Sequence, residues 1–302
     1  LYSDRNLLDK YFVQPMQYFY EYSGRSEQVA NRARQSAALY GERGAVYQQR
    51  ESGAIYNLYA GRTIPAFAYR EMCNYYLNYD FSIVLTLLLC LYGIIGTFVS
   101  ERETQMDMLL LVSSNGGRKT TLAKILAATL FLLLTSLWFS LLDLIGFAAS
   151  FQTLEGLALP VFAIPNFAEA SVNLSIFQYV LLSAALKCAG AWMIGMLWLL
   201  VSMFWKNALL PFVINFALCM ALTVSGAACA YSNFFWTKVL NPYSLLTNRI
   251  LLGKTEFVNL GGFPVLTWQA AVWISLTAGF VLVTAIYFLS AENCHRCVGR
   301  AK

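Results

Sequence analysis

Two ionisable side chains, Asp143 and Lys187, lie deep inside apolar stretches of this sequence. A charge within a membrane is costly and usually faces a partner or a water-filled cavity. At 1.5 Å per residue, Asp143 lies ~10 Å and Lys187 ~16 Å from the ends of their stretches on one common side. An ion pair between the two stretches is therefore feasible, and this is the interpretation we favour. The alternative is that Lys187 lines a path across the membrane.

A second motif with chemical potential, residues 116–120 (GGRKT), superficially suggests a phosphate-binding loop. It fails the G-x-x-x-x-G-K-[ST] spacing, because Arg118 separates Gly117 from Lys119. No other segment of the sequence fits that spacing. We therefore expect no cofactor and no ATP site in this chain, so any ATP-derived energy would have to come from a partner.

The sequence Cys294-His295-Arg296-Cys297 brings three possible zinc ligands together near the C-terminus. A structural zinc site needs four ligands, and lipidation of a cysteine next to a membrane is an alternative. We interpret the two cysteines as reduced cytoplasmic thiols and predict no metal site. His295 is the only histidine in the chain, so histidine-based catalysis within or outside a membrane is excluded.

A charged segment, residues 101–119, separates two long apolar stretches; we call it the elbow. Between its two groups of charges lies a short apolar run at 106–112. This run is too short to cross a bilayer core, which takes ~20 apolar residues. Such a segment at a membrane surface is most simply an interfacial helix that contacts the membrane or a partner protein.

The composition indicates that membrane helices position these residues. The chain is 58% hydrophobic and only 12% charged, whereas soluble domains have roughly 25% charged residues. We predict an all-α polytopic membrane protein whose transmembrane domain, residues 80–290, has five visible spans at 81–100, 120–150, 176–204, 208–230 and 267–290. Two short apolar pieces in 231–266, broken at Asn241-Pro242 and Gly261-Gly262, fit re-entrant or interfacial helices.

Residues 1–79 are polar and mixed in charge, and they contain 13 of the 18 tyrosines. Their richness in Ala, Gln, Glu and Arg predicts a small, mainly helical domain. The tyrosines offer an aromatic surface to a cargo in one interpretation. We favour the other, in which the rings form the core of a small domain.

Lysine and arginine residues in short connections set the orientation of membrane spans. They gather in the elbow, in the turn at 205–207 and in the tail at 291–302. The span count places these three segments on one side, which we expect to be the cytoplasm. The net charge of +5 thus reflects topology and does not indicate binding to nucleic acid. Residues 1–79 would then be extracellular, and we expect a sixth span upstream of Leu1 to export them.

The elbow resembles the first cytoplasmic loop of ABC-2-type exporter permeases. That loop commonly runs acidic-x-acidic, a leucine-rich stretch, a small-residue break, an arginine, and a lysine that opens the next span. The matching positions, in order, are Glu101, Glu103, Leu109 to Leu111, Ser113-Ser114, Arg118 and Lys124. The sequence NPYSLL at 241–246 is similar to the family as well. Many members have a proline before the arginine, where this chain has Gly116-Gly117.

The resemblance covers roughly residues 81–290. It implies a permease in a bacterial plasma membrane that pairs with a second copy or a homologue. Each half would dock a nucleotide-binding ATPase subunit, which carries the ATP and Mg²⁺. The elbow's short helix would be the coupling helix, seated in a groove on that ATPase. The coupling residues would be Glu101, Arg102, Glu103, Met106, Asp107, Leu109, Leu110, Arg118, Lys119 and Lys124.

Variants of the family with a soluble domain between spans one and two are most similar to this chain, and they include peptide-antibiotic exporters and immunity systems. The apolar, aromatic spans favour an amphipathic peptide, antibiotic or lipid-like cargo. A subunit that senses an extracellular peptide without bulk transport would carry the same elbow. A membrane-bound transferase needs an acid, base or metal cluster at a membrane face, and the loop 151–175 offers only Glu155 and Glu169. We therefore expect a transport subunit, not an enzyme.

Overall fold

The computed structural model describes residues 6–67, 71–106, 118–230 and 235–300. The chain is 80% helical, as the composition predicts. It divides into two compact units that each draw on three separate parts of the chain. Unit 1 comprises residues 1–78, 145–182 and 249–270, and unit 2 comprises residues 79–144, 183–248 and 271–302.

Five helices of the described chain are long and apolar enough to cross a membrane, which confirms the predicted number of visible spans. They are α5 (Phe81–Glu103), α7 (Arg118–Phe151), α8 (Ile176–Ser202), α9 (Leu209–Ala230) and α13 (Thr267–Arg300). Their bounds differ from the sequence estimate mainly at charged ends. Helix α5 continues through Glu103 and α13 continues to Arg300, because Glu, Arg and Ala are good helix formers.

The core of unit 2 lies where α5, α7 and α8 meet, and its most buried side chains include Leu91, Leu132 and Trp198. Glycine permits close approach of the helices. A Cβ atom at Gly195 of α8 would lie 2.3 Å from a methyl carbon of Leu132 on α7. Small residues at such crossings let membrane helices pack backbone against side chain without a void.

The segment predicted as re-entrant or interfacial helices is mixed in structure. It contains the short helices α10 (Phe235–Leu240), α11 (Tyr243–Thr247) and α12 (Arg249–Leu252), followed by the antiparallel strands β1 (Phe257–Leu260) and β2 (Phe263–Leu266). Residues 257–266 are thus a hairpin rather than a helix. Gly261 and Gly262 form its turn with φ of +62° and +88°, a conformation that two-residue hairpin loops favour and glycine adopts at no steric cost.

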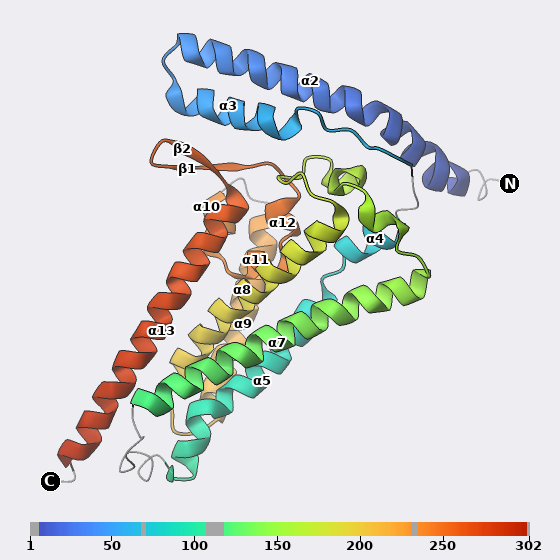
Figure 1. The fold of residues 1–302 in the computed structure, drawn as a ribbon. Helices are drawn as coiled ribbons and strands as arrows, with labels where there is room; N and C mark the ends of the chain where they lie inside the picture. Colours follow the sequence, from blue (N-terminus) through green and yellow to red (C-terminus); the bar gives the residue numbers. More distant parts are fainter. Residues whose placement is uncertain (1–5, 68–70, 107–117, 231–234, 301–302) are drawn as a thin grey trace. The chain divides into compact units, whose positions relative to one another are not determined.

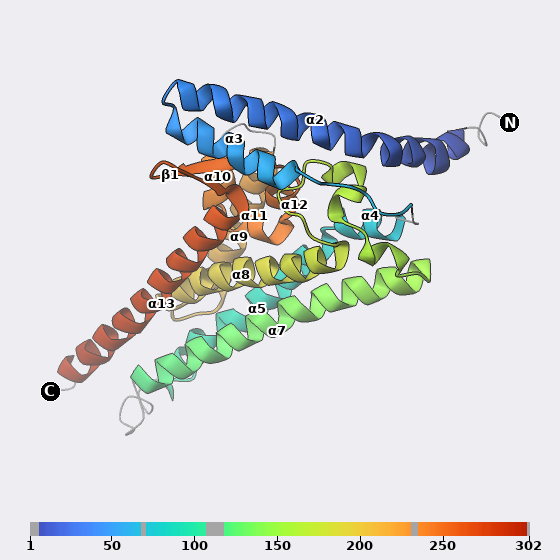
Figure 2. The same cartoon turned by 45° about the horizontal axis from the view of Figure 1, so that its top comes forward.

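The N-terminal part of unit 1 is a pair of helices, α2 (Gln14–Glu42) and α3 (Val46–Tyr59), preceded by a π-helical turn at Asp9–Val13. Both views show α2 and α3 side by side (Figure 1, Figure 2). Helix α4 (Glu71–Leu77) and three short 3₁₀ turns at Glu155–Ala158, Val161–Ala163 and Pro165–Phe167 complete the helices of this unit outside the long spans and α12. Residues 1–78 are thus grouped in one compact unit with two later segments of the chain.

Arg62 joins the N-terminal part of unit 1 to the loop that follows α7. Its side chain is 3% exposed. The guanidinium donates hydrogen bonds of 2.7 Å to Asn173 Oδ1 and to the Ala170 carbonyl, and it lies 4.2 Å from the ring centroid of Tyr59. The tyrosines divide accordingly: Tyr22 is buried, whereas Tyr20 is 72% exposed, so only part of the aromatic set forms a core.

Candidate functional site

The polar end of α5 is the part of the elbow that the structure describes best. Glu101, Arg102 and Glu103 are the last three residues of this helix. Thr104 caps its end, and Gln105 follows in the left-handed conformation (φ +55°). Thr104 donates a hydrogen bond from its hydroxyl back to the Ser100 carbonyl, at 2.8 Å. The helix thus carries three consecutive charges to its end, and each one has a different partner.

Glu101 forms an ion pair with Lys124 of α7. The two side chains are 27% and 14% exposed, and the Lys124 ammonium also lies 4.5 Å from the ring centroid of Phe98. Partial burial reduces solvent screening of such a pair. The contact closes the base of the elbow, since it joins the helix that enters the elbow to the helix that leaves it.

Arg102 binds the end of α8. Its Nη1 donates hydrogen bonds to the carbonyls of Met203 and Trp205, the second at 3.1 Å. Met203 directly follows Ser202, the last residue of α8, and Trp205 lies within the turn that leads to α9. The final carbonyls of a helix have no partner within the helix and carry a partial negative charge, so a guanidinium is a favourable partner for them.

Glu103 binds the start of α9. Its Oε1 accepts a 2.8 Å hydrogen bond from the backbone N–H of Ala208, the residue before Leu209. The first N–H groups of a helix are unpaired donors at its positive end, where a carboxylate is stabilising. Arg102 and Glu103 therefore match the negative end of α8 and the positive end of α9 with charges of opposite sign.

The structure thus brings four of the predicted coupling residues together: Glu101, Arg102, Glu103 and Lys124. Arg118 and Lys119 are exposed at the start of α7, and the Arg118 guanidinium lies 5.9 Å from the ring centroid of Tyr287 on α13. Met106 is 52% exposed. Three further predicted coupling residues lie outside the described residues: Asp107, Leu109 and Leu110.

Sequence reasoning missed the targets of Arg102 and Glu103. They are backbone groups of residues 203–208, the turn between α8 and α9. The sequence indicates that turn by its short polar Lys206-Asn207 step between apolar stretches. It gives no sign that another helix would bind the turn, because a backbone carbonyl is common to every residue.

The predicted intramembrane pair, Asp143 and Lys187, lies in a second polar cluster of unit 2. Ser82 donates a hydrogen bond from its hydroxyl to Asp143. Lys187 is attracted electrostatically by Asp143 and by Asp80, although no direct ion pair between Asp143 and Lys187 is present in the described part of the chain. The two charges are therefore neighbours that interact at longer range than contact.

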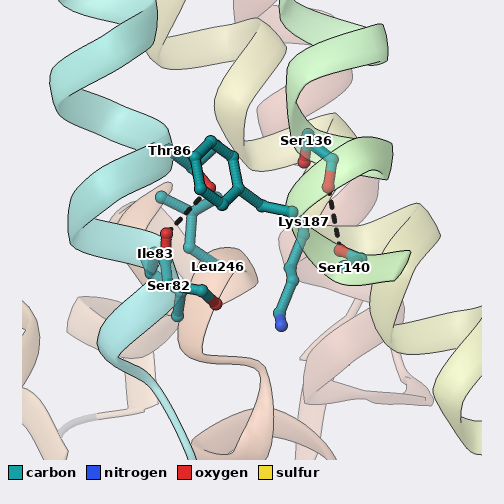
Figure 3. A pocket seen from close by; sticks show the side chains of 8 residues that line it. Ser82, Ile83, Thr86, Ser136, Ser140, Lys187 and Leu246 are labelled. Atoms are coloured by element: carbon teal, nitrogen blue, oxygen red, sulfur yellow. Dashed lines mark hydrogen bonds between the residues drawn. The ribbon is translucent and has the colours of Figure 1, made fainter. Parts of the chain in front are cut away.

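Lys187 borders a small cavity together with hydroxyl groups of α5 and α7, as Figure 3 shows. Within its walls, Thr86 donates to the Ser82 carbonyl and Ser140 donates to the Ser136 carbonyl. The cavity measures about 10 Å³, which is room for one water molecule. In this conformation, the Lys187 site holds no space for a cargo.

Hydrogen bonds and electrostatic attraction hold both clusters together, with charges, hydroxyls and backbone groups of the protein as the partners. Among the described residues, no group of three or more His, Cys, Asp and Glu side chains could hold a metal ion.

The charged end of α5 is therefore best described as a joint that holds α7 and the α8–α9 turn. In comparisons with known proteins, no protein-family model and no curated protein matches the chain.

Proposed function

We propose that this chain is the transmembrane permease subunit of an ATP-driven exporter of the ABC-2 type. It moves an amphipathic peptide, antibiotic or lipid-like cargo out of the cell with energy from a separate ATPase subunit. The observation that carries the proposal is the elbow between two membrane-length helices, whose base is closed by the Glu101–Lys124 ion pair. A loop that only connected two spans would need neither the apolar run at 106–112 nor a closed base.

The placement of the basic segments supports the proposed topology. Arg102 contacts the α8–α9 turn, and Thr121 near the start of α7 shares a 2.6 Å hydrogen bond with Ser290 in the last part of α13. The elbow, the turn and the C-terminal part of α13 therefore lie at one end of unit 2. This is the arrangement that the span count requires if all three face the cytoplasm.

In the proposed mechanism, the ATPase closes on ATP and pushes the elbow helix. Because the ion pair fixes α5 to α7 at the elbow's base, both helices move as one rigid body. A second copy or a homologue supplies the other half of the path. The movement opens the region around Lys187, which is closed to cargo in the present conformation.

A sensing or immunity subunit is the second candidate, and the water-sized cavity at Lys187 favours it. A protein that detects an extracellular peptide and passes a signal to an ATPase needs a coupling elbow but no path for cargo. Reconstituted complex in vesicles distinguishes the two: a permease accumulates or expels cargo with ATP, whereas a sensor changes ATP hydrolysis without moving cargo.

Co-purification of the intact protein in a mild detergent tests the proposed ATPase partner. Wild type is compared with the double variant Met106→Asp/Leu110→Asp and with the control Leu154→Asp, which places one carboxylate at a 54% exposed leucine outside the elbow. The double variant should recover roughly tenfold less ATPase, because a carboxylate in an apolar groove costs at least about 1.4 kcal/mol. The control should match wild type. If wild type recovers no ATPase at all, the proposal fails.

A further inference from the structure

Met203 of the α8–α9 turn is buried in the core of unit 2, but among the described residues no side chain of the turn donates or accepts a hydrogen bond at either helix end. Ser202, which ends α8, donates its hydroxyl back to the Leu199 carbonyl, and Lys206, the basic residue of the turn, is exposed. Phe204 and Leu209 are 60% and 75% exposed. The turn therefore relies on other elements for the side-chain groups that cap its two helix ends.

Those groups come from two adjacent residues of α5. Arg102 binds the carbonyl of Met203, directly after the end of α8, and the carbonyl of Trp205 in the turn. Glu103 binds the backbone N–H of Ala208, directly before α9. The order of the charges matters, because the α8 end is negative and the α9 start is positive. If the two charges were exchanged, a carboxylate would face the negative end of α8 and a guanidinium would face the positive start of α9.

We infer that Arg102 and Glu103 form a clamp that fastens the α8–α9 turn to the end of α5, so that α8 and α9 follow any movement of the elbow. The clamp is a positioning device, because its contacts are to backbone groups of the α8–α9 turn. Its role in transport rests on the proposed function, since it extends the rigid body from α5 and α7 to two more spans. The existence of the clamp rests on the hydrogen bonds alone.

Hydrogen–deuterium exchange of the intact protein in lipid nanodiscs tests the fastening without any partner. The variants are Arg102→Met and Glu103→Ala, with Lys206→Met as a control that removes one charge from the same turn. We expect exchange of the amides at 203–210 to accelerate roughly tenfold in the two clamp variants, because local opening governs protection. The control should keep the wild-type rate, and Arg102→Lys should recover part of the protection by retaining the charge.

The coupling role is tested by the cargo exported per ATP hydrolysed in reconstituted complex. A loosened turn together with fewer cargo molecules exported per ATP, at unchanged ATPase recovery, supports the inference. If the amides of the turn exchange faster but the cargo exported per ATP stays at the wild-type value, the clamp is only structural. If the amides exchange at the wild-type rate, the clamp does not hold the turn. Either result overturns the inference. If wild type recovers no ATPase, it is the proposed function that fails, and the exchange rates still decide whether the clamp exists.

Discussion

Lys124 near the start of α7 pairs with Glu101 at the end of α5, 23 positions earlier in the chain. Because the pair is mostly buried, removal of either partner leaves a charge with reduced access to water. We expect Lys124→Met or Glu101→Gln to lower the free energy of unfolding by on the order of 1–2 kcal/mol. Thermal unfolding in detergent measures the loss. The exchanged pair Glu101→Lys/Lys124→Glu should recover most of it, and a double variant no better than the singles would contradict a direct pair.

The close approach of α7 and α8 gives a second prediction. The new methyl group of Gly195→Ala would lie 2.3 Å from a carbon of Leu132, and overpacking of this kind costs about 1–3 kcal/mol. Gly96→Ala on α5 is the matched control, because a Cβ there meets no atom within 4 Å. We expect a lower Tm for Gly195→Ala and an equal or higher Tm for Gly96→Ala. Leu132→Ala should relieve the clash in the double variant.

The stability of unit 1 depends on the hydrogen bonds that the Arg62 guanidinium donates from two of its nitrogens. Arg62 reaches Asn173 from its Nε and Ala170 from its Nη2. Lysine keeps the charge but carries all of its donors on one nitrogen, so it cannot reproduce this two-nitrogen geometry. Arg62→Lys should therefore cost about 2–3 kcal/mol, the penalty for buried groups left without partners. Limited proteolysis within 155–175 reports the local loss. Arg25→Lys, at an exposed ion pair, should leave the digestion pattern unchanged.

Much of this fold is readable from the sequence because hydropathy is a local property. The five long helices begin and end within a few residues of the predicted spans, except where helix formers extend α5 and α13. The Gly261-Gly262 turn was readable too, since two glycines between apolar runs are a hairpin signal. Interpreting them only as a break between helices was the error.

Other features depend on contacts that no local pattern encodes. The association of residues 1–78 with two later segments depends on pairs such as Arg62 with Asn173, 111 positions apart. The clamp on the α8–α9 turn uses backbone groups, which every residue has. The charges of the elbow could be found from their spacing, but the partners of Arg102 and Glu103 could not.

Cys73 of α4 provides a prediction about pH. Burial raises the pKa of its thiol from 9.0 to about 11, and the side chain is 1% exposed. The folded state holds this proton more tightly than the unfolded state, so the contribution to stability is complete below pH 9 and is lost as the pH rises towards 11. At pH 8, a maleimide should label Cys73 only after unfolding, as peptide mass spectrometry can measure. A Tyr20→Cys variant, at a 72% exposed position, should react in the folded protein; rapid labelling of native Cys73 would contradict its burial.

The two interpretations of Lys187 make opposite predictions for the same pair of variants. If Lys187 mainly balances Asp143 and Asp80, Lys187→Met should lower the Tm, and adding Asp143→Asn should restore it, because the amide removes a negative charge and still accepts the Ser82 hydrogen bond. If Lys187 instead contacts the cargo, Lys187→Met should reduce export while the Tm and the amount of recovered ATPase stay near the wild-type values. Adding Asp143→Asn should then not restore export. The attraction between the charges makes the first outcome our expectation. The cavity beside Lys187 has room for one water molecule, which agrees with this expectation. A cargo could reach Lys187 only after α5, α7 and α8 had separated around it.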